Sequence, residues 1–107
     1  MEMKDLTGDD LLVVCAALGN PHRLRIMAAL EKGRQYVSLL ARELEISRPL
    51  LHMHLQKLEA AGLVRGELEL SEEGKAVKYF EPTDFQLKLT PKTIGDAVST
   101  LRRASES

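Results

Sequence analysis

Apolar side chains form a regular stripe between Ser47 and Gly62. Leu51, Leu55 and Leu58 are separated by four and three residues, the spacing of one face of an amphipathic helix. Ser47 is a suitable N-cap for this helix, and Gly62 stands where a helix commonly stops. We therefore predict a helix over this segment with one buried face.

The opposite face of this helix carries mainly polar and cationic groups. At about 100° per residue, seven side chains project away from the leucine stripe. They are Arg48, Pro49, Leu50, His52, Met53, Gln56 and Lys57. Because a helix of this size fits the major groove of DNA, this face is a candidate reader of base pairs.

A shorter apolar cluster precedes this helix. Ser38 can cap a helix that ends in a turn at Glu45 and Ile46. Its apolar residues would lie on one side and are Leu39, Leu40, Ala41 and Leu44. The predicted order is therefore a short helix, a tight turn and a second helix.

Two further helices are expected nearer the N-terminus. Thr7 and Asp10 form a capping box in front of a helix, expected over about residues 8–18, that is apolar all round. Such a helix cannot bury every face in a small domain, so part of it should pack on another copy. Asn20 and Pro21 open the next helix, which would turn Leu24, Met27, Ala28 and Leu30 inward.

The period of the pattern changes from helix to strand after Gly62. Glutamate and leucine alternate over residues 67–70, a turn follows, and residues 75–81 return as the second strand of a hairpin. Alternation over residues 85–89 indicates a third short strand or an extended linker.

A last helix is expected over residues 91–104, opened by Thr90 and Pro91. Its apolar stripe would consist of Ile94, Ala97, Val98 and Leu101. The predicted elements together give a mainly α (α+β) fold of about five helices with a β-hairpin. With 107 residues and 44% hydrophobic content, we expect residues 1–107 to form one domain.

The amino-acid composition argues against several classes of function. The four aromatic residues are too few for base stacking to be the main binding mode, which argues against a reader of single strands or RNA. Cys15 is the single cysteine, and we expect it to be a small buried residue without a disulfide. No signal peptide and no apolar run of about 20 residues is present, so a cytoplasmic location is expected.

Positive charge is concentrated around the helix pair. Residues 21–65 contain eight Lys or Arg and four Glu, a net charge of +4. Residues 1–20 and 66–89 each have a net charge of −3. Because neutralisation of phosphates is local, this asymmetry favours a nucleic-acid surface on the central segment, although any single cation is more often simply a solvated side chain.

Three segments carry a recognisable order of motifs: ALGNPHRLRIMAAL, LARELEISRPLLHMHLQKLEAAGLV and ELELSEEGKAVKYF. Over residues 11–81 this order resembles the ArsR-type winged helix-turn-helix repressors. The helix-turn-helix motif of that family is matched by Ala41, Ile46-Ser47, His54-Leu55 and Ala61-Gly62-Leu63-Val64. Glu45 departs from the pattern, since the family often has Gly at this turn position.

The resemblance implies a winged helix-turn-helix fold, in which the hairpin is the wing and helix 47–61 reads DNA. Arg48 and Gln56 are expected to read base edges, with further groove contacts from Leu50, His52 and Met53. Phosphate contacts are expected from Arg42, Lys57, Arg65, Lys75 and Lys78, and from the helix N-terminus at Ser47.

The resemblance also implies a homodimer, because the first and last helices form the dimer interface in such relatives. The interface residues expected here are Leu11, Val14, Leu18, Ile94, Val98 and Leu101. A two-fold dimer would present two reading helices about 34 Å apart and would favour an inverted-repeat operator. Repression is the default activity of the family.

Metal ligands and cofactors are not expected. His52 and His54 are two residues apart, about 200° around a helix, so they cannot hold one ion between them. His54 is expected to pack against a neighbouring helix, and His22 to lie on the surface. A pocket between the wing and the last helix could admit a small-molecule effector, but no residue of the sequence requires one.

Two other classes of function compete with sequence-specific DNA binding. A winged helix can serve as a protein-interaction module in a larger assembly, in which case duplex binding would be weak and without sequence preference. An enzyme is the least favoured class, because no nucleophile constellation, phosphate loop or pair of carboxylates is recognisable.

Overall fold

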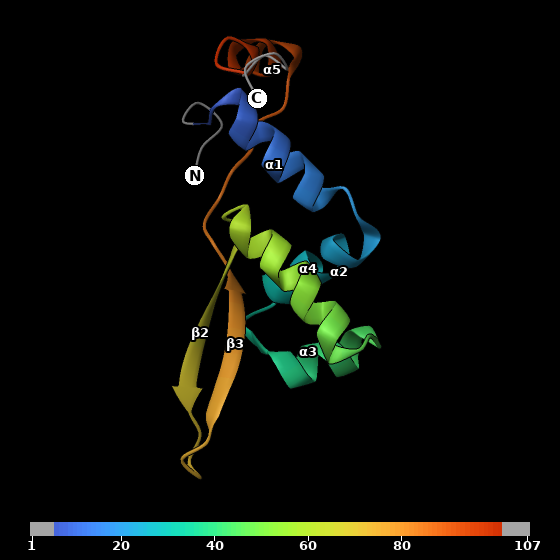
Figure 1. The fold of residues 1–107 in the computed structure, drawn as a ribbon, viewed down its shortest axis with the longest axis vertical. Helices are drawn as coiled ribbons and strands as arrows, with labels where there is room; N and C mark the ends of the chain where they lie inside the picture. The colour runs from blue at the N-terminus through green and yellow to red at the C-terminus, as the bar shows by residue number, and fades with distance from the viewer. Residues whose placement is uncertain (1–5, 102–107) are drawn as a thin grey trace.

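The structure, a computed structural model, describes residues 6–101 of the 107-residue chain. The described part is elongated, with extents of 52 × 23 × 22 Å. The wing and the last helix lie at opposite ends, with the other helices between them (Figure 1). In chain order the elements are α1 (Gly8–Leu18), α2 (Pro21–Glu31), β1 (Gln35–Tyr36), α3 (Val37–Leu44), α4 (Arg48–Ala60), β2 (Val64–Leu70), β3 (Ala76–Pro82) and α5 (Pro91–Val98).

Local capping signals begin most of these helices. Thr7 and Asp10 form the expected capping box of α1, and the Asn20 side chain accepts hydrogen bonds from the first backbone N–H groups of α2. Ser47 Oγ accepts from the N–H of Leu50 at 3.3 Å and caps α4. These starts confirm the predictions from sequence.

The predicted cap at Ser38 is wrong. Tyr36 occupies the N-cap of α3 without a side-chain hydrogen bond, and the helix begins at Val37. The strand β1 ends at Tyr36 and the helix follows it directly, so Ser38 lies within the first turn of α3 and not at its cap.

The leucine stripe of α4 is the centre of the core. Leu51, Leu55 and Leu58 are completely buried, together with Ile26 and Leu30 of α2. Other buried partners are Leu40, Ala41, Leu63, Val64 and Phe80. The stripe therefore fixes α4 on its inner side and leaves the outer face to solvent.

Three apolar residues predicted to point inward are exposed. Leu24 and Ala28 lie on the outer face of α2, because the buried stripe of that helix consists of Ile26, Ala29 and Leu30. Leu39 is exposed on α3, where the next two residues take the buried positions. Both helices contain more apolar residues than one face can hold.

The sheet has three strands in the order β1-β3-β2. Strands β2 and β3 form the predicted antiparallel wing, with a register from Val64 opposite Pro82 to Leu70 opposite Ala76. The third strand exists but is β1, which pairs with the other edge of β3. Residues 85–89 form the extended linker that was the alternative prediction, and Phe85 and Leu87 pack against the core.

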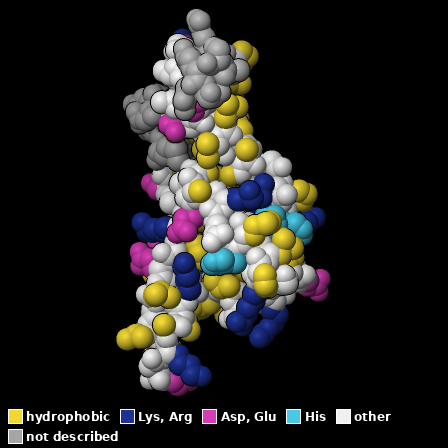
Figure 2. All heavy atoms as spheres, viewed as in Figure 1, with side chains coloured by type: hydrophobic (Ala, Val, Ile, Leu, Met, Phe, Trp, Pro, Cys, Tyr) yellow, Lys and Arg dark blue, Asp and Glu magenta, His cyan; other side chains and the backbone are white. Residues whose placement is uncertain are grey.

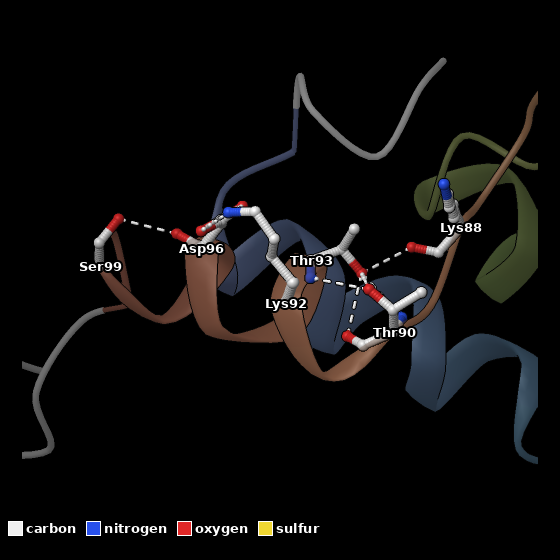
Figure 3. Close-up of polar contacts among 6 residues, drawn as sticks. All are labelled: Lys88, Thr90, Lys92, Thr93, Asp96 and Ser99. Carbon is white, nitrogen blue, oxygen red and sulfur yellow. Dashed lines mark hydrogen bonds and ion pairs between the residues drawn. The ribbon is translucent and has the colours of Figure 1, made fainter.

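Helix α5 begins as predicted but ends at Val98, so the predicted extent to residue 104 is wrong within the described part. The Thr90 and Thr93 side chains form a capping box at its start (Figure 3). At its end the hydroxyls of Ser99 and Thr100 donate to the carbonyl oxygens of Asp96 and Ala97, at 2.8 and 3.0 Å. These side chains satisfy carbonyl groups that a continuing helix would use. Residues 102–104 lie outside the described residues.

Two further findings concern the exposure of Cys15 and the apolar character of the helices. Cys15 is exposed on α1, contrary to the expectation of a buried residue, because Leu11, Val14 and Ala17 form the buried side of that helix. None of the helices within residues 6–101 combines the length and apolar character needed to cross a membrane.

Candidate nucleic-acid interface

The outer face of α4 is open to solvent along its length. Arg48, His52 and Gln56 are exposed at intervals of four residues, so they form one row on this face. Leu50 and Met53 lie beside that row with exposures of 36% and 41%. The structure thus brings together the five side chains predicted to enter the major groove.

A groove lies between the start of α4 and the wing. Its volume is about 840 Å³, and its lining includes Arg48 on one side and Lys75 and Lys78 on the other. Figure 2 shows Lys and Arg side chains at several places around the central helices and on the wing, interspersed with Asp and Glu. Three of the predicted DNA-binding residues, separated in sequence, therefore meet around one positively charged concave surface, a suitable place for a phosphate backbone.

The turn before α4 is formed by a residue with positive φ. Glu45 adopts φ 56° and ψ 43°, which lie in the left-handed region that residues other than Gly rarely occupy. The N–H groups of Glu45 and Ile46 donate to carbonyl oxygens of α3, at 3.2 and 3.1 Å. The turn thus has the conformation that Gly usually provides, despite the glutamate at this position.

A polar cluster that no pattern in the sequence predicted connects the wing to β1. Arg34 pairs with Glu69 at 3.0 Å, and its guanidinium lies 4.2 Å from the centre of the Tyr79 ring. The hydroxyls of Tyr36 and Tyr79 donate to Glu69 and Glu67, at 3.0 and 3.1 Å. Burial and the bond to Glu67 raise the pKa of Tyr79. The cluster fixes the distal part of the hairpin to β1 and hence to the start of α3.

The remaining predicted phosphate contacts are dispersed. Arg42 is exposed near the end of α3. Arg65 lies at the base of the wing, where its Nε donates to Glu81 at 2.7 Å; this bond and the carboxylate charge raise the pKa of Arg65 and offset its charge. Lys57 borders a separate hollow between α1 and α4.

His54 lies on the inner side of α4 and is 3% exposed, as expected for a packing residue. The ring of His22 lies against it, with centroids 5.1 Å apart, and is itself half-buried, so the expected surface position of His22 is wrong. Burial, followed by the charges of Arg23, His22 and Lys57, lowers the pKa of His54. His54 therefore favours its neutral form.

The residues predicted for a dimer interface divide into two groups. Leu11 and Val14 are buried within the chain, and Leu18 packs against the core. Ile94, Val98 and Leu101 are 37–56% exposed. On α1, Leu12 and Val13 are exposed too, at 59% and 50%. The apolar surface of α1 available to a partner is thus formed by Leu12 and Val13, because α1 turns Leu11 and Val14 toward its own chain.

The described residues contain no cluster of three or more side chains suited to a metal ion. The wing and α5 lie at opposite ends of the described part of the molecule, so they do not form the pocket that the sequence suggested between them (Figure 1). A groove of about 840 Å³ instead lies between the wing and the helix pair α3 and α4.

Comparison with known proteins gives consistent matches. Residues 20–65 match the family described as bacterial regulatory protein, arsR family. An uncharacterized HTH-type transcriptional regulator of Methanocaldococcus jannaschii is 36% identical over 85 residues, which are 79% of this chain and 88% of that protein.

Solved structures agree with this result. The crystal structure of a possible transcriptional regulatory protein (fragment 1-100) from Mycobacterium bovis has a TM-score of 0.62 and 27% identity, covering 69% of this chain and 74% of that chain. A solution structure from the same organism, described as a homodimeric winged helix-turn-helix DNA-binding domain, has a TM-score of 0.59 and 27% identity, covering 69% and 64% of the two chains. These matches confirm the winged helix-turn-helix fold.

Proposed function

Since this chain belongs to the arsR family of bacterial regulatory proteins and is a DNA-binding transcriptional regulator, we propose that it represses transcription by binding an inverted-repeat operator as a homodimer. The observation that carries this proposal is the outer face of α4, with Arg48, His52 and Gln56 exposed in one row above a fully buried leucine stripe. Such a helix can enter a major groove without loss of its packing.

The contacts divide into two kinds. Arg48 and Gln56 have the donors and acceptors needed to read base edges, and Leu50, His52 and Met53 supply further contacts within the groove. Lys75 and Lys78 line the same groove as Arg48, which supports a role for them in holding one phosphate backbone. Arg42, Lys57 and the N-terminus of α4 at Ser47 provide additional phosphate contacts, and Arg65 a weaker one because Glu81 offsets its charge.

The dimer is proposed to form through α1 and α5. Leu12, Val13, Ile94, Val98 and Leu101 are large hydrophobic side chains exposed at this end of the described chain. Because these side chains are already about half-buried, burial of the area still exposed would contribute roughly 0.5–1.5 kcal/mol for each. The homodimeric domain from Mycobacterium bovis supports this assembly.

We further propose that residues 1–107 act as one winged helix-turn-helix unit in the cytoplasm, by binding rather than by catalysis and without a cofactor. The relatives named above are transcriptional regulators, a class that generally acts in this way. The alternative is a protein-interaction module that binds DNA without sequence preference, and the experiment below must distinguish it from a sequence-specific regulator.

Selection of bound sequences from a random duplex pool tests the proposal. The purified protein, with its mass in solution known, is incubated with the pool at moderate salt, and bound duplexes are sequenced over several rounds. Enrichment of an inverted repeat with half-sites about one helical turn apart is the expected result. Binding without enrichment that disappears as salt increases would contradict it and favour the protein-interaction module.

A further inference from the structure

Arg23, near the start of α2, joins three helices. Its Nε donates to the carbonyl oxygen of Ala17 at 2.6 Å, and its Nη2 to that of Ala16 at 3.4 Å. Its Nη1 lies 3.0 Å from Nδ1 of His54 on α4. One guanidinium therefore connects the end of α1 with the helix that carries the DNA-reading face.

The hydrogen bonds from Arg23 to α1 are explained by the free carbonyl groups at the end of that helix. Ala16 and Ala17 lie in the last turn of α1, where carbonyl groups have no partner within the helix and the helix dipole is negative. The last turn of α1 contains no basic residue of its own. Arg23 supplies the missing donors and charge, and within residues 6–101 it has no carboxylate in an ion pair.

The α4 end depends on the protonation state of His54. An arginine can only donate, so Nδ1 must accept and the proton of the neutral ring is on Nε2. Protonated His54 would turn a second donor toward Arg23 and break the bond. Burial and the neighbouring Arg23, His22 and Lys57 hold the pKa of His54 below its ordinary value, which keeps Nδ1 available as an acceptor.

The surface between α1 and α4 is hollowed beside this link. A hollow of about 320 Å³ lies there, lined by Val13, Ala16, Ala17, Arg23, Lys57 and Ala60. Small side chains on both helices leave this space, so they constrain the angle between α1 and α4 less than interlocking large residues would. Arg23 is the polar connection across the same junction.

We propose that Arg23 is a positioning residue that fixes the direction of α4 relative to α1 and thereby determines which half-site spacing the dimer accepts. The proposal rests on the proposed function. Because α1 belongs to the proposed dimer surface, the two-fold axis is fixed relative to α1 in both copies. The angle between α1 and α4 then sets the separation and tilt of the two reading helices.

The test uses three duplexes derived from the selected operator: one with the selected spacing, one with a spacer changed by one base pair, and one with a single half-site. R23K retains the charge but loses the fork that reaches both helices. H54L removes the acceptor from the other end. H54N is the matched control, since its side-chain oxygen can accept near the position of Nδ1.

R23K and H54L are expected to bind the selected spacing about tenfold more weakly, while binding to the altered spacer and to the single half-site is unchanged. The preference for one spacing would thus shrink, and H54N would keep it. Thermal unfolding and sedimentation confirm that each variant is folded and dimeric.

Equal losses by R23K on all three duplexes would overturn the proposal, because they indicate a phosphate contact or a folding defect. An unchanged spacing preference in R23K or H54L, or a loss of it in H54N, would overturn it as well. If the wild-type protein itself shows no sequence preference, the proposed function fails together with this inference.

Discussion

The contact between α1 and α5 leaves no space for a side chain at Gly8. A Cβ at this position would lie 2.6 Å from the carbonyl oxygen of Ala97 and 2.9 Å from Cβ of Leu101. The Gly8 N–H also donates to Thr100 Oγ1 at 2.8 Å. G8A therefore forces α5 to move away from α1, since the nearest clash is with its backbone.

We expect G8A to lower the free energy of unfolding by about 1–3 kcal/mol, the usual cost of overpacking. For a domain of this size about 2 kcal/mol lowers Tm by roughly 8–16 °C. Thermal unfolding at one fixed protein concentration measures the change, because dimer stability depends on concentration. Sedimentation should also show a weaker dimer, since α5 carries part of the proposed interface.

G95A is the matched control on α5 itself. Gly95 is exposed, and a Cβ there meets no atom within 4 Å. The same substitution should therefore stabilise the helix by about 0.5–1 kcal/mol, because alanine loses less backbone entropy than glycine. A G8A protein as stable as the wild type would refute the close approach of the two helices.

Three further predictions concern the reading end. The pKa of His54 in the folded protein is lowered from 6.5, so the unfolded state takes up the proton first as pH falls. The free energy of unfolding should therefore decrease as pH drops below about 6.5 and become constant below the folded pKa. H54N, measured by urea unfolding, should lack this pH-dependent decrease. E45G should raise the free energy of unfolding in urea by up to about 1 kcal/mol by removing a strained φ, whereas E45A should not. R48A should reduce the binding free energy for the operator by about 1–3 kcal/mol and relax the preference at one base pair. K75A should weaken binding to every duplex and reduce the salt dependence of the binding constant by about one unit. Equal losses of affinity by R48A on all sequences would contradict base reading.

The parts of the fold that sequence alone could predict have local causes. The caps at Thr7, Asn20 and Ser47, and the stop at Gly62, each involve residues within one helical turn. Strand β1 was missed because its two residues gain their conformation from β3, far along the chain. Its omission also caused the wrong start of α3.

The candidate site was predictable only where one helix contains it. The outer face of α4 follows from the leucine stripe, so Arg48, His52 and Gln56 could be named in advance. Strand register decides the rest, since it places Arg65 opposite Glu81 and brings Lys75 and Lys78 to the groove beside Arg48. No periodicity along the chain could have indicated the contact between Arg23 and His54, which depends on how three helices pack.

Strand β2 is the outer edge of the sheet and carries two leucines, Leu68 and Leu70, exposed at 71% and 73%. An edge strand with exposed leucines has unpaired backbone groups, with which a strand of another chain can pair, and such pairing leads to aggregation. Glu67 and Glu69 alternate with these leucines, and Glu72 and Glu73 follow in the turn. Where two such edges pair with the glutamates in register, carboxylate opposes carboxylate, so these side chains act against edge-to-edge pairing.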